Sequence, residues 1–75
     1  MTRNKKIEIK MPHKVYTKPK DLIRVNNELG KKANEGKLIA LRREKDKLMF
    51  AEPSINGIWT IFLNKDGYIN KITLW

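Results

Sequence analysis

The side chains that could perform catalysis are few in this sequence, and they are scattered along it. His13 is the only histidine, and it lies between Pro12 and Lys14. The chain has no cysteine, which excludes disulfides, thiolate zinc sites and thiol nucleophiles. A metal site needs three or four converging ligands, and the neighbours of His13 do not supply them. We therefore expect neither a metal nor any other cofactor.

The remaining candidates for chemistry are equally isolated. Ser54 is the only serine, and its surroundings lack the tight glycine frame of a nucleophile elbow. Glu44 and Asp46 are two positions apart, but basic residues surround them, so ion pairing is their simpler role. No pair of acids lies between apolar neighbours in a way that indicates a raised carboxyl pKa. Because each common reaction needs a constellation that is missing here, we expect no enzymatic activity.

Basic side chains are the most informative polar feature, because they gather in one part of the chain. Residues 1–47 hold 15 of the 17 Lys and Arg and six of the eight acids, whereas residues 48–75 are net neutral. Lysine outnumbers arginine 13 to 4, which favours contact with phosphates over bidentate reading of bases. An AT-rich genome would produce the same lysine excess without any function. The asymmetry indicates a nucleic acid or an acidic protein as partner.

The candidate contacts to nucleic acid lie near the N-terminus and in one charged turn. Each phosphate that such side chains neutralise adds salt-dependent affinity, whereas a merely solvated surface would only keep the protein soluble. If the first strand borders the turn at 41–48, the two groups form one strip. Tyr16, which lies among lysines, is the best candidate for stacking on a base. The predicted contacts are Lys5, Lys6, Lys10, Lys14, Tyr16, Lys18, Lys20, Arg42 and Arg43.

The length of 75 residues predicts one small domain, with residues 1–4 as a flexible tail. A domain of this size buries only about 60% of its unfolded surface, so a partner or a second copy would help it fold. No apolar run approaches the roughly 20 residues that span a bilayer. Glu8 and Lys10 interrupt the apolar stretch of any signal peptide. We expect a cytoplasmic protein with no membrane partner.

The first elements that must position these residues are a strand and a helix. Apolar and charged residues alternate over 6–11, which predicts a half-buried strand that Pro12 ends. Residues 13–18 then form a connector, and Pro19 begins a helix. The helix ends at Gly36, or already at Gly30 with 31–36 as a loop. Its apolar stripe consists of Leu22, Val25, Leu29 and Ala33.

Two hairpins are predicted to follow the helix. Residues 38–51 contain two apolar stretches around six polar residues, which favours two strands over one amphipathic helix and leaves the helix open. Pro53 to Gly57 is a turn. Strands over 58–63 and 68–75 then meet at a bulged loop over 64–67.

The register of the second hairpin decides what the sheet exposes. If Asn64 pairs with Tyr68, then Phe62 faces Asn70, Thr60 faces Ile72, and both faces are about half apolar. One helix covers only one face, so a second subunit, the connector around Tyr16 or a ligand should cover the other. The candidate protein interface is Trp59, Ile61 and Trp75, although a tryptophan in a strand more often belongs to the core.

These patterns together predict an α+β fold, with one helix packed on a small, mostly antiparallel sheet of about five strands. The order is strand-helix-strand-strand-strand-strand. The first hypothesis for function is a small, non-enzymatic nucleic-acid-binding protein, with RNA or single strands slightly favoured over duplex DNA. The alternative is a phage-type accessory or inhibitor protein that binds an acidic host protein through an apolar sheet face. A homodimer is compatible with either hypothesis.

Overall fold

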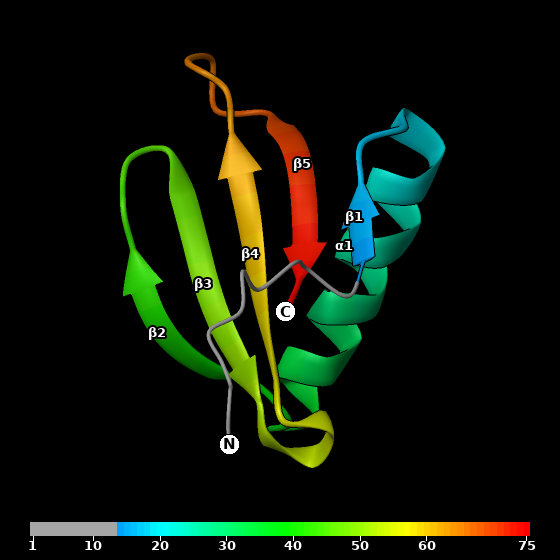
Figure 1. The fold of residues 1–75 in the computed structure, drawn as a ribbon, viewed down its shortest axis with the longest axis vertical. Helices are drawn as coiled ribbons and strands as arrows, with labels where there is room; N and C mark the ends of the chain where they lie inside the picture. Colours follow the sequence, from blue (N-terminus) through cyan, green and yellow to red (C-terminus); the bar gives the residue numbers. More distant parts are fainter. Residues whose placement is uncertain (1–13) are drawn as a thin grey trace, which may run out of the picture.

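One helix packs against a five-stranded antiparallel sheet, which confirms the predicted α+β architecture (Figure 1). The computed structural model describes residues 14–75. The sheet order is β1-β5-β4-β3-β2, so β1 and β2 form opposite edges. The elements are β1 (Lys14–Tyr16), α1 (Pro19–Asn34), β2 (Ile39–Arg43), β3 (Lys47–Glu52), the short 3-10 helix η1 (Pro53–Ile55), β4 (Gly57–Leu63) and β5 (Ile69–Leu74).

The first described strand lies in the segment that we predicted to be a connector. Val15 and Tyr16 are strand-prone residues, and β5 offers them a free edge, so three residues pair there as β1. The connector prediction is therefore wrong for residues 14–16. The strand predicted over 6–11 lies outside the described residues.

Helix α1 begins at Pro19, as predicted, and continues through Gly30 to Asn34. Its N-terminal turn carries Asp21 and its last turn carries Lys31 and Lys32, charges that suit the helix dipole. The helix ends where Gly36 adopts a φ of +73°, which favours glycine. The stripe that it buries is Leu22, Val25 and Leu29.

The predicted hairpin over 38–51 is confirmed as β2 and β3, and β2 bulges between Ala40 and Arg42. The predicted turn over 53–57 is also present, with Asn56 in the left-handed region at a φ of 52°. Across residues 14–75, no helix is long and apolar enough to cross a membrane.

The second hairpin is present, but its predicted register is wrong beyond the loop. The Asn64 N–H donates to the Tyr68 carbonyl at 2.8 Å, as the prediction required. Leu63 then pairs with Ile69 while Phe62 pairs with Lys71, which leaves Asn70 as a bulge. The bulge shifts the faces of β5 by one residue. Six apolar residues therefore share the face toward α1: Trp59, Ile61, Leu63, Ile69, Ile72 and Leu74.

The core lies between that sheet face and the stripe of α1. Trp59 and Ile61 are each 6% exposed, and Ile72 is fully buried. The prediction that Trp59 and Ile61 belong to an uncovered face is therefore wrong, because the bulge in β5 brings Ile72 and Leu74 onto their face, and this apolar face is the one that α1 covers. Figure 1 shows α1 beside β1 and β5, so that β2 and β3 extend beyond the helix.

Candidate nucleic-acid interface

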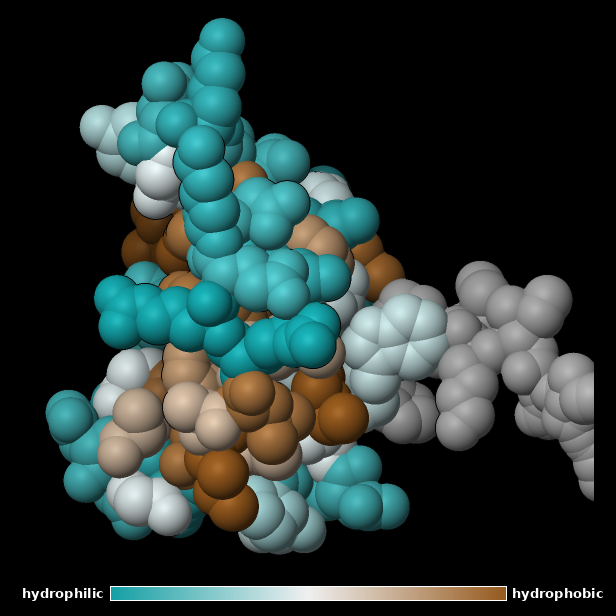
Figure 2. All heavy atoms as spheres, turned by 90° about the vertical axis from the view of Figure 1, so that its left-hand side faces the viewer, coloured by the Kyte–Doolittle hydropathy of each residue, from teal (hydrophilic) through white to brown (hydrophobic). Residues whose placement is uncertain are grey.

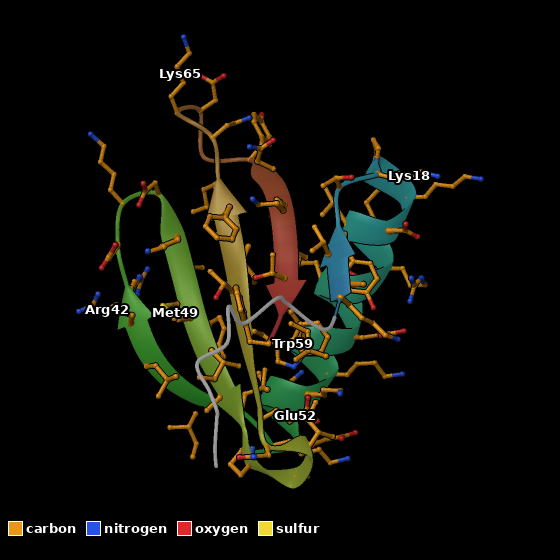
Figure 3. The ribbon with its side chains drawn as sticks, in the orientation of Figure 1. Lys18, Arg42, Met49, Glu52, Trp59 and Lys65 are labelled. Atoms are coloured by element: carbon orange, nitrogen blue, oxygen red, sulfur yellow. The ribbon has the colours of Figure 1, made fainter. Side chains whose placement is uncertain are left out.

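The basic residues that the sequence singled out do not form one strip within the described part of the chain. Lys14 lies on β1, while Lys18 and Lys20 lie at the start of α1. Arg42 and Arg43 lie on β2, at the opposite edge of the sheet. Figure 3 shows Lys18 and Arg42 on opposite sides of the molecule. Four strand spacings of about 4.8 Å separate the two edges by roughly 19 Å. Lys5, Lys6 and Lys10 lie outside the described residues.

Tyr16 occupies a different place from the one a stacking residue needs. It pairs with Ile72 and is half-buried against the core on the helix side of the sheet. The Arg24 guanidinium lies 5.8 Å from the centre of its ring. Tyr16 therefore lies on the side of the sheet that α1 covers, and its ring packs in part against the core.

The sheet face opposite α1, which we call the outer face, collects a different set of side chains. Within residues 14–75, no other helix or strand packs on this face. Directly paired residues in an antiparallel sheet point to the same side, so the registers define three rows across it. The outer face consists of the row Ile39, Ala51, Ile58 and Trp75, the row Arg42, Met49, Thr60, Thr73 and Val15, and the row Lys47, Phe62 and Lys71.

The third row places an aromatic ring between two lysines. Phe62 on β4 pairs with Lys47 on β3 and with Lys71 on β5. The Lys71 ammonium lies 4.7 Å from the centre of the Phe62 ring, and both side chains are partly accessible. Neither lysine forms an ion pair with another described residue. Both charges therefore remain available to an anion.

The middle row adds polar groups beside this triplet. Arg42 stands at the β2 edge, beside Met49 (Figure 3), and its guanidinium lies 3.1 Å from the Glu44 carboxylate. Thr60 and Thr73 pair across β4 and β5 and are 4% and 5% exposed. The Thr73 hydroxyl is buried without a hydrogen-bond partner among the described residues.

Trp75 is the residue of the outer face that the sequence indicated as part of a protein interface. Its backbone exchanges two hydrogen bonds with Ile58, at 2.9 and 3.1 Å, which extends the β4–β5 ladder by one residue. The side chain is 39% exposed. It therefore differs from Trp59 in remaining accessible at the end of the first row.

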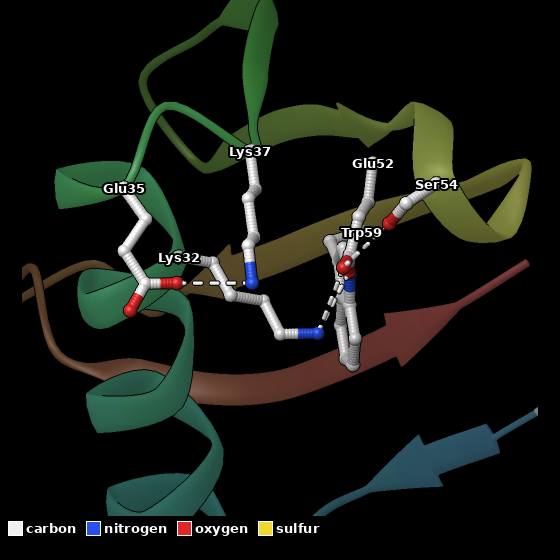
Figure 4. A network of polar contacts seen from close by, with 6 residues as sticks. All are labelled: Lys32, Glu35, Lys37, Glu52, Ser54 and Trp59. Atoms are coloured by element: carbon white, nitrogen blue, oxygen red, sulfur yellow. Dashed lines mark hydrogen bonds and ion pairs between the residues drawn. The ribbon is translucent and has the colours of Figure 1, made fainter.

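Trp59 belongs instead to a buried polar network on the helix side (Figure 4). The Trp59 indole N–H donates to the Glu52 carboxylate at 2.9 Å, and the Lys32 ammonium donates to both Glu52 oxygens at 2.9 Å. Ser54 adds a hydrogen bond at 3.3 Å. Burial alone would raise the pKa of Glu52, but the hydrogen bonds from Trp59 and Lys32 and the Lys32 charge outweigh it, so this pKa is lowered.

This network joins α1 to β3, η1 and β4 rather than forming a reaction site. Glu52 is 3% exposed, and its oxygens are occupied by the donors just named. Among residues 14–75, no three His, Asp or Glu side chains gather where a metal ion could bind.

Sequence reasoning missed Lys47, Phe62 and Lys71, because their proximity depends on strand pairing. Lys71 lies in the net-neutral segment 48–75, where we expected no contact with nucleic acid, and the bulge at Asn70 had no distinct signal in the sequence. Glu52 and Lys32 were also missed. An acid that directly follows the apolar run Leu48–Ala51 could have indicated a buried partner.

Comparisons with known proteins do not distinguish between the two hypotheses for function. No protein-family model, curated protein or solved structure matches this chain. Function must therefore be inferred from the residues that the fold brings together.

Proposed function

We propose that this is a small, non-enzymatic protein that binds single-stranded nucleic acid, RNA or DNA, on the outer face. The observation that carries this proposal is the position of Phe62 between Lys47 and Lys71. A base can stack on the accessible aromatic surface, which is worth about 1–3 kcal/mol per base, while the ammonium groups reach the neighbouring phosphates. Trp75 offers a second aromatic surface on the same face.

The shape of the face favours an unpaired strand over a duplex. Bases in a single strand can turn toward a sheet and stack on its aromatic residues, whereas the bases of a duplex are already stacked on each other. Reading of a duplex in its major groove commonly uses a basic helix. On α1, Arg24 lies within reach of two acids, Asp21 at 3.4 Å and Glu28 at 3.6 Å, so the helix surface has mixed charge.

The N-terminal lysines belong to the proposal as additional backbone contacts. Lys14 and Lys18 are exposed, and the whole chain carries a net charge of +9, which attracts an anionic polymer from any direction. We also propose a cytoplasmic location, since the expected partner is intracellular and the chain has no cysteine.

The test compares the affinity for fluorescein-labelled oligouridylate, measured by anisotropy over a range of salt concentrations. Replacing Lys47 and Lys71 together by Ala should reduce the slope of log affinity against log salt by about 1.4, at roughly 0.7 per phosphate contact. Phe62→Leu should weaken binding at every salt concentration with little change in slope, because it removes stacking and no charge.

A control with the same loss of charge distinguishes a binding site on the outer face from a general attraction of nucleic acid to a basic protein. Lys31 and Lys65 are exposed lysines outside the outer face, so replacing both by Ala should cost less affinity than replacing the Lys47 and Lys71 pair. Equal losses in the two double variants, together with no effect of Phe62→Leu, would contradict the proposal. A variant with Lys6, Lys10, Lys14 and Lys18 all changed to Ala measures the N-terminal contribution in the same assay.

A further inference from the structure

The helix side of the sheet carries a second surface, because α1 covers only part of it. A hollow of about 370 Å³ lies between α1 and the β2–β3 half of the sheet. A neighbouring hollow of about 420 Å³ lies between α1 and the β4–β5 loop. Both hollows are lined by Asn26 and Asn27, so they follow one another along the same side of the helix. We call this continuous feature the helix-side groove.

The groove has the dimensions of a missing helix. The five strands span roughly 19 Å between the outermost strands, and packed helices lie about 8–10 Å apart, so this sheet has room for two helices side by side. One place is occupied by α1, which packs against the β5 side. The other place is the groove. Its length along a 16-residue helix approaches about 24 Å.

The floor of the groove is apolar and incompletely buried. Leu48 and Phe50 of β3 contact the core but are only partly buried, and the same holds for Leu38, which precedes β2. At the other end, Ile23 is 64% exposed and Tyr68 is 72% exposed. A row of such side chains along a groove is the surface that an amphipathic helix buries when it binds.

Basic side chains outnumber acidic ones beside one end of the groove. Arg43 shares a row with Leu48 on the helix side of β2. A third hollow, between the two hairpin loops, is lined by Lys45, Asp46 and Lys65 and shares Gly67 with the groove. None of these three cations forms an ion pair with another described residue. Figure 2, seen from the side of β2, shows hydrophilic atoms at the top and in a band above exposed hydrophobic ones.

We infer that the helix-side groove binds an acidic amphipathic helix of another protein. Apolar residues of that helix would cover Leu48 and Phe50, and its carboxylates would face Arg43, Lys45 and Lys65. A second copy of the chain fits less well, since each copy carries a net charge of +9. A strand added to β2 also fits less well, because the bulge in β2 and its two arginines oppose edge pairing.

Gly30 provides a variant that tests the groove without endangering the fold. It lines the groove, and a Cβ added there would meet no atom within 4 Å. Gly30→Leu should therefore fill the groove while removing a glycine from the helix interior. Gly30→Ala is the matched control, because it makes the same backbone change and leaves most of the groove empty.

The probe is a synthetic helical peptide with leucine on one face and glutamate on the other. Titration into the full chain, followed by backbone amide NMR shifts, should move the signals of Gly30, Ala33 and Leu48 while sparing those of Phe62 and Lys71. Gly30→Leu should weaken binding by at least about tenfold relative to Gly30→Ala. Changing Arg43 and Lys45 to Glu should also weaken it.

Several outcomes would overturn the inference. One is equal binding of a scrambled peptide with the same composition, and another is equal affinity of the Leu and Ala variants. Light scattering that shows a dimer for the free chain and a monomer for Gly30→Leu would assign the groove to a second copy. Oligouridylate that shifts Gly30 and Leu48, but not Phe62, would assign it to nucleic acid instead and would contradict the outer-face proposal as well.

Discussion

At the scale of single residues, Glu52 is the most constrained group in the described part of the chain. Its carboxylate receives hydrogen bonds from a helix residue, Lys32, and from a strand residue, Trp59. The Lys32 ammonium also lies 5.7 Å from the centre of the Trp59 ring. Three elements are thereby held together at one point, and removing any partner leaves the other groups unsatisfied.

We predict that Lys32→Met lowers the free energy of unfolding by about 2 kcal/mol, because it leaves the Glu52 charge buried with fewer donors. The Lys32 side chain is 31% exposed, which keeps the expected loss below that of a fully buried pair. Urea denaturation followed by tryptophan fluorescence measures the change. Lys37→Met is the control, since its 3.1 Å pair with Glu35 is exposed on both sides and should contribute about 0–1 kcal/mol. Equal losses in the two variants would show that the Glu52 network adds no stability.

At the scale of elements, α1 contains one glycine inside and one just beyond its end. Both glycines have open space at the position of a Cβ, so steric crowding does not distinguish them. Their backbones differ, because only Gly36 has a positive φ, at +73°.

We therefore predict opposite effects of the same substitution. Gly30→Ala should raise the free energy of unfolding by about 0.5–1 kcal/mol, because alanine favours the helix interior. Gly36→Ala should lower it by about 1 kcal/mol, because a Cβ opposes the left-handed conformation. Thermal unfolding by circular dichroism measures both changes. A loss of stability in Gly30→Ala would mean that the helix is strained there.

Local patterns explain which elements could be predicted. The apolar stripe of α1 and the turn residues of both hairpins are signals that involve only residues close together in the sequence. These elements could therefore be predicted correctly. The partner of β1 and the bulge at Asn70 depend on contacts between distant strands. Because a shift of one residue exchanges the faces of a strand, the missed bulge moved Lys71 and Thr73 to the wrong neighbours.

At the scale of the whole molecule, the two sides of the sheet offer different chemistry. The outer face presents the lysines around Phe62, whereas the helix side presents an apolar groove with Arg43 beside it. Under the two proposals above, a nucleic-acid strand and a protein helix would bind on opposite sides of the sheet and would not compete for the same side chains. The basic N-terminal segment and the net charge of +9 would strengthen the first contact and speed the second.

The net charge of +9 also makes the fold sensitive to acid. The pKa of Glu52 is lower in the folded protein than its ordinary value of 4.5. A carboxylate with a lowered pKa contributes stability that is fully present above the unfolded value and is lost as the pH falls through the folded value. Protonation of the remaining acids also increases the net positive charge and its self-repulsion.

We expect the free energy of unfolding to fall between about pH 5 and about pH 3, which urea denaturation at each pH can measure. Added salt should restore the stability that is lost through charge repulsion, because salt screens exposed charges. It should restore little of the stability that is lost when Glu52 is protonated, because that carboxylate is buried. Glu52→Gln should be less stable at neutral pH and should show a shallower dependence on pH in this range. The same slope in this variant and in the original chain, both measured in high salt, would show that Glu52 does not set the acid limit of the fold.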